Sequence, residues 1–201
     1  MLKKYIVIPI LCIAILAIYL INGIFLQKSI AKKVVRLHII ANSNSAFDQN
    51  LKLQVRDKIV EYLAPKLINS NSIEESKIII ADNTENIKQI TKEITSQYSD
   101  YEINVSLGSS KFPTKSYENY SFPAGTYDAL KITIGEGAGN NWWCVMFPPL
   151  CFTNSSIGAF SKESEELLES SLSKEELNTI KHSEKPEVQI KFKFLEWWNS
   201  K

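Results

Sequence analysis

The 201-residue sequence is poor in the residues from which metal sites and nucleophilic catalytic sites are built. It has 2 histidines and 3 cysteines, and it contains no CxxC or HxxxH pair, so the ligand spacing of a metal site is absent. It also lacks a G-x-S-x-G motif and a glycine loop followed by Lys-Ser or Lys-Thr, which argues against a serine hydrolase and against a phosphate-binding loop. We therefore expect no metal, no cofactor and no small-molecule substrate.

A strong charge of one sign is missing as well. The chain has 23 lysine and arginine residues against 22 acidic residues, a net charge of +1. No basic stripe interleaved with aromatic residues stands out, so nucleic-acid binding has no electrostatic support. The composition, 44% hydrophobic and 22% charged, is that of an ordinary globular domain.

The long uncharged run of the chain lies at the N-terminus, where residues 5–26 carry no charge and Asn22 is the only strongly polar side chain. A run of about 20 apolar residues can cross the hydrocarbon core of a bilayer. A buried core helix is not favoured, because the run is apolar on every face. Residues 1–31 are therefore predicted to be a signal peptide or a membrane anchor that places the rest of the chain outside the cytoplasm.

Two interpretations of this segment stay open. Ser29-Ile30-Ala31 offers the small residues that a signal peptidase prefers, with cleavage after Ala31. The apolar run is longer than the roughly 7–15 residues of a usual signal core, which favours an uncleaved anchor. The basic residues on both sides of the run do not decide its orientation.

Hydrophobic periodicity predicts a single α+β domain over residues 34–198, with a mixed or antiparallel sheet and two long helices packed on one face. The uninterrupted apolar run at 142–147 is typical of a central strand. The strands are predicted at 34–41, 101–107, 127–134, 142–147 and 188–194.

The helices have their own start and stop signals. The first begins near Asp48 and ends or bends at Pro65. The second begins at a capping box formed by Ser72 and Glu75, with a break at residues 82–83. A polar helical stretch follows later, at about residues 162–182.

Two of the cysteines, Cys144 and Cys151, have a C-x6-C spacing that contains Pro148 and Pro149. Outside the cytoplasm such a pair suggests a disulfide, which needs a bend at the prolines to bring the Cα atoms within about 7 Å. The alternative is two buried free thiols that pack as small hydrophobic side chains. Cys12 lies in the N-terminal run and is expected to be inert.

His38 lies in a predicted strand and is followed by Asn42 and Asp48, which makes these three residues candidate functional polar groups. Cys144, His38 and Asp48 together would supply the nucleophile, the base and the orienting acid of a thiol hydrolase. An exported cysteine hydrolase using Cys144 and His38 is therefore an alternative function. The simpler interpretation is a histidine whose hydrogen bonds are satisfied in the core or in an interface.

Trp142 and Trp143 are adjacent in a predicted strand, so their side chains face opposite sides of the sheet. One can be buried in the core, and the other is then exposed or covered by another element. An exposed tryptophan beside Phe147 would be a good anchor for a protein partner. Core packing under the helices is the alternative for either tryptophan.

Three stretches of the chain resemble the stage II sporulation protein R family. They are residues 36–43 (RLHIIANS) with 48–57 (DQNLKLQVRD), residues 112–127 (FPTK, Tyr117, PAG and Tyr127), and residues 139–152 (GNNWWCVMFPPLCF). The third stretch is highly specific, because tryptophan, cysteine and proline are rare residues. The resemblance covers about residues 34–154, and Asn44 departs from the acidic residue that the family usually has there.

The resemblance implies a signalling protein of sporulation that is not an enzyme. Such a protein is made in the forespore and exported, anchored or secreted, into the intermembrane space. There it activates a membrane-bound aspartic protease that processes the sigma-E precursor in the mother cell. An activator needs surface anchors, for which the candidates are Trp142, Trp143, Phe147, Arg36 and Arg56. A structural protein of the envelope is a third possibility.

Overall fold

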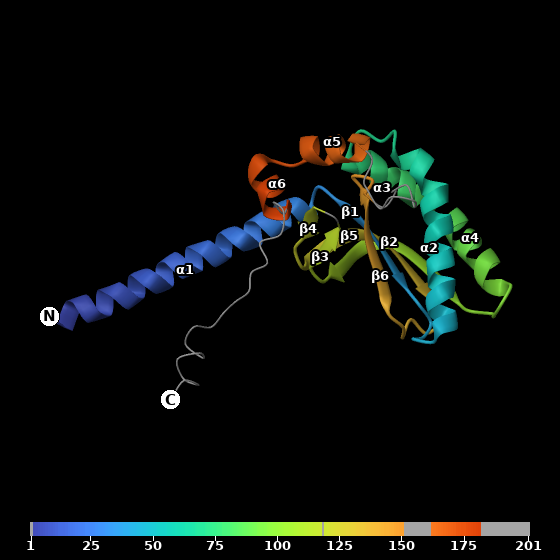
Figure 1. Ribbon diagram of the computed structural model, residues 1–201, viewed down its shortest axis with the longest axis horizontal. Coiled ribbons are helices and arrows are strands. Elements are labelled where there is room, and N and C mark those ends of the chain that lie inside the picture. Colours follow the sequence, from blue (N-terminus) through green and yellow to red (C-terminus); the bar gives the residue numbers. More distant parts are fainter. Residues whose placement is uncertain (1, 118, 151–161, 182–201) are drawn as a thin grey trace, which may run out of the picture.

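The computed structural model describes residues 2–117, 119–150 and 162–181, and it shows a long helix that leads into one folded α+β domain (Figure 1). Helix α1 (Leu2–Ala31) projects from the domain, and the large apolar side chains along it are exposed. Residues 7–31 are long and apolar enough to cross a membrane. The helix therefore fits the predicted anchor or signal segment.

A four-stranded sheet forms the centre of the domain, and it is mixed, one of the two arrangements that the sequence predicted. Strand β1 runs parallel to β5 and antiparallel to β6, and β2 runs antiparallel to β5, in the order β2-β5-β1-β6. A separate hairpin pairs β3 with β4. The strands are β1 (Val35–Ile40), β2 (Ile103–Phe112), β3 (Lys115–Tyr117), β4 (Tyr120–Phe122), β5 (Gly125–Ile134) and β6 (Asn141–Phe147).

The prediction of a central strand at 142–147 is wrong, because β6 is at the edge of the sheet and pairs only with β1 among the described strands. Its side chains are nevertheless buried on both faces. Cys144 and Met146 pack in the cluster under the helices, whereas Val145 packs in the cluster on the opposite face. An uninterrupted apolar run follows from burial on both faces, and it does not require a strand neighbour on each side.

Three helices cover one face of the sheet (Figure 1): α2 (Ala46–Leu67), α3 (Ile73–Asp82) and α4 (Thr84–Ser96). The buried side of α2 carries Val55, Ile59 and Leu63 at helical spacing, and it packs against Leu37 and Ile39 of β1. The 3.6-residue period of the sequence therefore predicted the side of α2 that meets the sheet.

Local signals determine the helix ends only in part. Pro65 lies inside α2 and does not end it. The Ser72 hydroxyl accepts a hydrogen bond from the backbone N–H of Glu75 at 3.1 Å, but the Glu75 carboxylate accepts from the backbone of Asn71, so half of the predicted capping box is present. Asn83 separates α3 from α4 at the predicted break. The second long helix is thus two helices.

The opposite face of the sheet carries a second apolar cluster. It is formed by the end of α1, the β3–β4 hairpin and two short helices, α5 (Lys162–Ser171) and α6 (Lys174–Ile180). Helix α5 lies across one end of the sheet (Figure 1), and α6 lies beside the end of α1. The single helix predicted at 162–182 is therefore two helices, and the strand predicted at 188–194 lies outside the described residues.

Candidate functional site

Trp142 and Trp143 lie on opposite faces of β6, as predicted, and both are half-buried. The guanidinium carbon of Arg56 lies 4.4 Å from the ring centroid of Trp142, on the helix side. The ammonium of Lys115 lies 4.4 Å from the ring centroid of Trp143, on the opposite face. Each indole is thus partly covered by a cation on a flexible stem, an interaction of about 1 kcal/mol that another aromatic or apolar contact can replace.

The His38 ring lies against Trp143, with 5.9 Å between the ring centroids and 20° between the ring planes. Its Nε2 is hydrogen-bonded to Oδ1 of Asn141 at 2.7 Å, whereas Nδ1 has no hydrogen-bond partner in the described part of the chain. Burial lowers the pKa of His38; the Asn141 hydrogen bond opposes this change, and the charge of Lys131 adds to it. His38 is therefore neutral at pH 7, with Nε2 donating to Asn141 and Nδ1 left as an acceptor.

These side chains belong to a part of the sheet that stays open. In one row across the strands, Ser106 neighbours Lys131, Lys131 neighbours His38, and His38 neighbours Trp143. In the next row Asn104 neighbours Thr133. Asn104 and Ser106 are exposed, Lys131, Thr133 and Trp143 are half-buried, and His38 is buried between its strand neighbours. We call six residues the open sheet surface: Asn104, Ser106, Lys131, Thr133, His38 and Trp143.

The open sheet surface is polar. Lys131 belongs to it and Lys115 borders it, and Glu102 lines the same hollow as Asn104, Ser106, Lys131 and Thr133. The indole Nε1 of Trp143 is a donor that, like Nδ1 of His38, has no hydrogen-bond partner among the described residues. Buried polar groups are nearly always hydrogen-bonded, and these two ring nitrogens are among the exceptions in the described residues.

Arg36 does not reach the surface, because its side chain is 0% exposed. Its guanidinium carbon lies between 4.4 and 5.7 Å from the centroids of four aromatic rings, one from each of β2, β3, β4 and β5. We call these rings the aromatic box: Phe112, Tyr117, Phe122 and Tyr127. Arg36 is therefore wrong as a direct partner contact in this structure.

Hydrogen bonds give Arg36 a structural role. Its Nε donates to the backbone oxygen of Cys144 at 2.9 Å, and its Nη2 donates to the Tyr117 hydroxyl at 2.8 Å. That hydroxyl donates in turn to the backbone oxygen of Trp143 at 3.0 Å. Burial lowers the pKa of Arg36, with Tyr117 and Tyr127 opposing the change, but the guanidinium stays charged. Arg36 thus ties the β3–β4 hairpin to the edge strand β6.

Phe147 is also wrong as a surface anchor. It is 3% exposed and packs in the cluster under the helices, because the register between β1 and β6 shifts at Val35 and Arg36 and turns Phe147 toward that side. Of the five predicted partner contacts, Trp142, Trp143 and Arg56 keep some exposed side-chain surface. Only Trp143 belongs to the open sheet surface.

Asp48 is the centre of a separate polar cluster at the start of α2. Its carboxylate accepts hydrogen bonds from Asn42 at 3.0 Å, from Ser43 at 2.5 Å and from the Tyr101 hydroxyl at 2.8 Å, while its own N–H donates to the Ser45 hydroxyl at 3.1 Å. Two of the predicted polar residues, Asn42 and Asp48, are therefore brought together. They connect the end of β1 to α2 and β2.

The three residues of the proposed thiol hydrolase are not brought together. Cys144 neighbours Leu37 across the strands and packs in the cluster under the helices, whereas His38 lies on the opposite face of the sheet. Asp48 is bonded to Asn42, Ser43 and Tyr101, and His38 is bonded to Asn141 instead. A base must lie within hydrogen-bonding reach of its nucleophile, so the geometry contradicts a Cys144–His38–Asp48 arrangement.

The predicted disulfide between Cys144 and Cys151 stays a prediction, because Cys151 lies outside the described residues. Cys12 is exposed on α1. Within residues 2–117, 119–150 and 162–181, no three histidine, cysteine, aspartate or glutamate side chains lie close enough together to hold a metal ion.

The turn between β5 and β6 packs tightly on the Asp48 cluster. Gly135 and Gly137 have positive φ angles of 56° and 62°, and the N–H of Gly139 donates to the backbone oxygen of Ala41 at 2.9 Å. Oδ1 of Asn44 accepts from the backbone of Asn140 at 2.7 Å. A carboxylate oxygen could accept the same bond, so the departure at Asn44 keeps this acceptor function.

Replacing Gly139 with alanine is expected to lower the free energy of unfolding by about 2 kcal/mol, because a new Cβ would lie 2.2 Å from the backbone oxygen of Ser43. Gly108→Ala is the matched control, because no atom lies within 4 Å of a Cβ at that position of β2. Urea denaturation of the full chain measures both variants. Equal stability of the two variants would contradict the close approach at Gly139.

Several residues of the site were not predicted to be functional from the sequence. Lys115, Asn141 and Lys131 surround Trp143 and His38, but each is an ordinary polar residue in the sequence. Tyr101 and Tyr117 donate to the Asp48 carboxylate and to the backbone of β6. The available signal was the position of Lys115, Tyr117 and Asn141 inside the stretches that resemble a family.

Comparisons with known proteins agree with that resemblance. The family model described as Stage II sporulation protein R matches residues 31–157. Stage II sporulation protein R of Bacillus subtilis (strain 168) is 38% identical over 181 residues, which cover 84% of this chain and 81% of that protein. No solved structure is significantly similar to the chain. The range matched by the family model contains the open sheet surface, the aromatic box and the Asp48 cluster.

Proposed function

Since the chain belongs to the stage II sporulation protein R family, we propose that it activates a membrane-bound aspartic protease that processes the sigma-E precursor in the mother cell. Membership supports a role in sporulation. In the proposal, the forespore makes the chain and α1 takes it across the forespore membrane. The folded domain then acts in the intermembrane space. The length and apolar character of α1 support this route.

The proposed action is binding without catalysis. This proposal is supported by the positions of Cys144 and His38, which lie on opposite faces of the sheet. The two residues therefore do not form the thiol hydrolase site considered from the sequence. A protein without its own chemistry can still activate an enzyme if it binds the active conformation more tightly than the inactive one. The activator then needs a specific surface more than it needs a pocket.

The observation that carries this proposal is the open sheet surface around Trp143. A half-buried tryptophan stacked on a neutral histidine, with one unpartnered ring nitrogen on each, has the character of an interface anchor. A specific contact buries roughly 800 Å² per partner, and a few aromatic anchors supply most of its free energy. Lys131 and Lys115 favour a segment of the protease that carries acidic or carbonyl groups.

Trp143→Ala and Lys131→Glu are each expected to reduce cleavage of the sigma-E precursor at least fivefold in sporulating cells that lack the native gene. Loss of a central tryptophan anchor costs about 2 kcal/mol of binding free energy, and a reversed charge repels an acidic partner segment. Immunoblotting of the precursor measures cleavage, and the level of the exported chain is checked in the same samples.

Lys88→Glu provides the matched control for the charge reversal, because Lys88 is exposed on α4, on the other side of the sheet. It is expected to leave cleavage unchanged. Full cleavage with both Trp143→Ala and Lys131→Glu, at normal protein level, would show that the open sheet surface is not the contact. Equal loss with Lys88→Glu would show that cleavage responds to charge in general.

A further inference from the structure

Helix α1 does not end where its apolar run ends, and its last turns are part of the folded domain. Ile30 is 0% exposed and belongs to the second apolar cluster together with Phe122, Tyr127 and Ile180. Leu26 and Ala31 pack against the same cluster. A helix that is exposed through Phe25 and buried at Ile30 passes from its surroundings into the protein core within about 1.5 turns.

Helix α6 binds this end of α1 through one carboxylate. Glu176 is 2% exposed; its Oε1 accepts from the Ser29 hydroxyl at 2.5 Å, and its Oε2 accepts from the Lys33 ammonium at 2.6 Å. The same Oε2 accepts from the backbone N–H of Ser173 at 2.6 Å, which completes the capping box of α6. One buried carboxylate therefore joins the start of α6 to residues on both sides of Ala31.

The electrostatics agree with this geometry. Burial by itself would raise the pKa of Glu176, but the bonds from Lys33, Ser29 and Ser173 outweigh burial and hold the pKa at about 2. The carboxylate is therefore ionised at any physiological pH and needs its partners, because a buried charge that loses its partner is costly.

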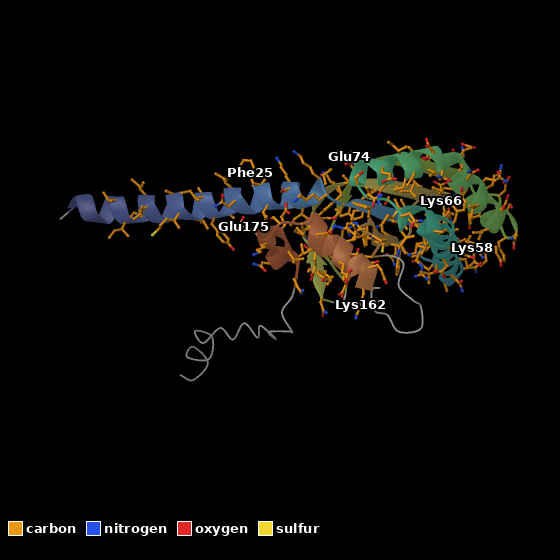
Figure 2. All side chains as sticks on the ribbon, turned by 90° about the horizontal axis from the view of Figure 1, so that it is seen from above. Phe25, Lys58, Lys66, Glu74, Lys162 and Glu175 are labelled. Atoms are coloured by element: carbon orange, nitrogen blue, oxygen red, sulfur yellow. The ribbon has the colours of Figure 1, made fainter. Side chains whose placement is uncertain are left out.

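A further contact joins α1 to the start of β5. The side chain of Gln27 occupies the space above Gly125, where an added Cβ would lie 1.9 Å from the Gln27 amide nitrogen. Phe25 of α1 and Glu175 of α6 line one cavity, and the two views place α6 beside the end of α1 (Figures 1 and 2). Three separate elements of the domain thus meet the last two turns of the helix.

We propose that the chain is not cut after Ala31: α1 is retained as an anchor, and Glu176 fastens the folded domain to its base at the membrane surface. Cleavage at that bond would remove Ile30 from the second cluster and Ser29 from Glu176. The peptide bond between Ala31 and Lys32 lies at the end of the helix, where the N–H of Lys32 donates to the backbone oxygen of Lys28 at 3.2 Å. A peptidase needs an extended substrate at the bond that it cuts. This inference does not depend on the identity of the protease partner.

The first test examines the exported chain. Cells producing the full chain are separated into membrane and soluble fractions, and the N-terminus is determined by intact mass and terminal sequencing. We expect the uncut 22.9 kDa chain in the membrane fraction. A soluble product that begins at Lys32 would overturn the retention of α1. Because neither result involves the sigma-E precursor, this outcome is separate from the outcome for the proposed function.

The second test examines the contact of Glu176 by hydrogen exchange of the full chain in lipid nanodiscs. Glu176→Gln keeps an oxygen for the Ser173 N–H but removes the charge that binds Lys33. We expect the amides of α6 to exchange at least tenfold faster than in the wild type. Lys174→Gln, which neutralises an exposed charge in the first turn of α6, is expected to leave the exchange unchanged. Equal exchange of α6 in all three proteins would overturn the role of Glu176.

Discussion

Replacing Arg36 with alanine is expected to lower the free energy of unfolding by about 4 kcal/mol. The change removes a side chain that is 0% exposed and leaves a cavity inside the aromatic box. It also leaves the backbone oxygen of Cys144 without its 2.9 Å hydrogen bond and the Tyr117 hydroxyl without its 2.8 Å donor. Urea denaturation of the detergent-solubilised full chain, followed by tryptophan fluorescence, measures the loss.

Arg36→Met separates packing from charge in the same measurement. Methionine fills much of the volume of the arginine side chain without carrying a charge. The buried guanidinium of Arg36 is costly, because no carboxylate of the described residues pairs with it. We therefore expect a loss of only about 1–2 kcal/mol, since the missing hydrogen bonds are offset by the absence of a desolvated guanidinium. A loss as large as that of Arg36→Ala would contradict this explanation.

The sequence predicted the elements of the fold better than their arrangement. Alternation and helical periodicity depend on neighbours in the chain, so they located β1, β5 and α2 and the buried sides of each. The order of strands depends on pairings between distant segments. The run at 142–147 was apolar because both of its faces are buried, and that property does not distinguish an edge strand from a central one.

In the candidate site, too, the local features were predicted from the sequence and the contacts between distant segments were not. The opposite orientation of Trp142 and Trp143 followed from the two-residue period of a strand, but their cations, Arg56 and Lys115, are distant in sequence. Arg36 was predicted to be a partner contact because arginine is a common anchor at protein interfaces. Its burial depends on four rings contributed by β2, β3, β4 and β5. No periodic pattern in the sequence predicts that four aromatic rings surround one arginine.

Asp48→Asn is expected to lower the free energy of unfolding by about 3 kcal/mol at pH 7. The Asp48 side chain is nearly buried, at 4% exposed, and its two oxygens accept from Asn42, Ser43 and Tyr101. Asparagine has a single acceptor oxygen, and it turns an N–H group toward donors. The loss should appear as a lower urea midpoint with an unchanged slope, because the denatured state is not altered.

The pH dependence identifies the charge as the cause. Burial by itself would raise the pKa of Asp48, but the hydrogen bonds from Ser43, Asn42, Tyr101 and Ser45 outweigh burial and hold the pKa at about 2, below the ordinary 3.8. The folded-state pKa is thus lower than the unfolded one. The stabilisation from Asp48 is fully present above about pH 4 and is lost as the pH falls through 2, an effect of about 2 kcal/mol.

The stability difference between the wild type and Asp48→Asn should therefore shrink by about 2 kcal/mol between pH 6 and pH 2. Glu176 titrates in the same range in both proteins, so its contribution cancels in the difference. Tyr101→Phe is the matched control: it removes one donor, keeps the carboxylate, and should cost about 1 kcal/mol while most of the pH dependence persists. A constant difference between wild type and Asp48→Asn would mean that the carboxylate stabilises this junction by its shape and not by its charge.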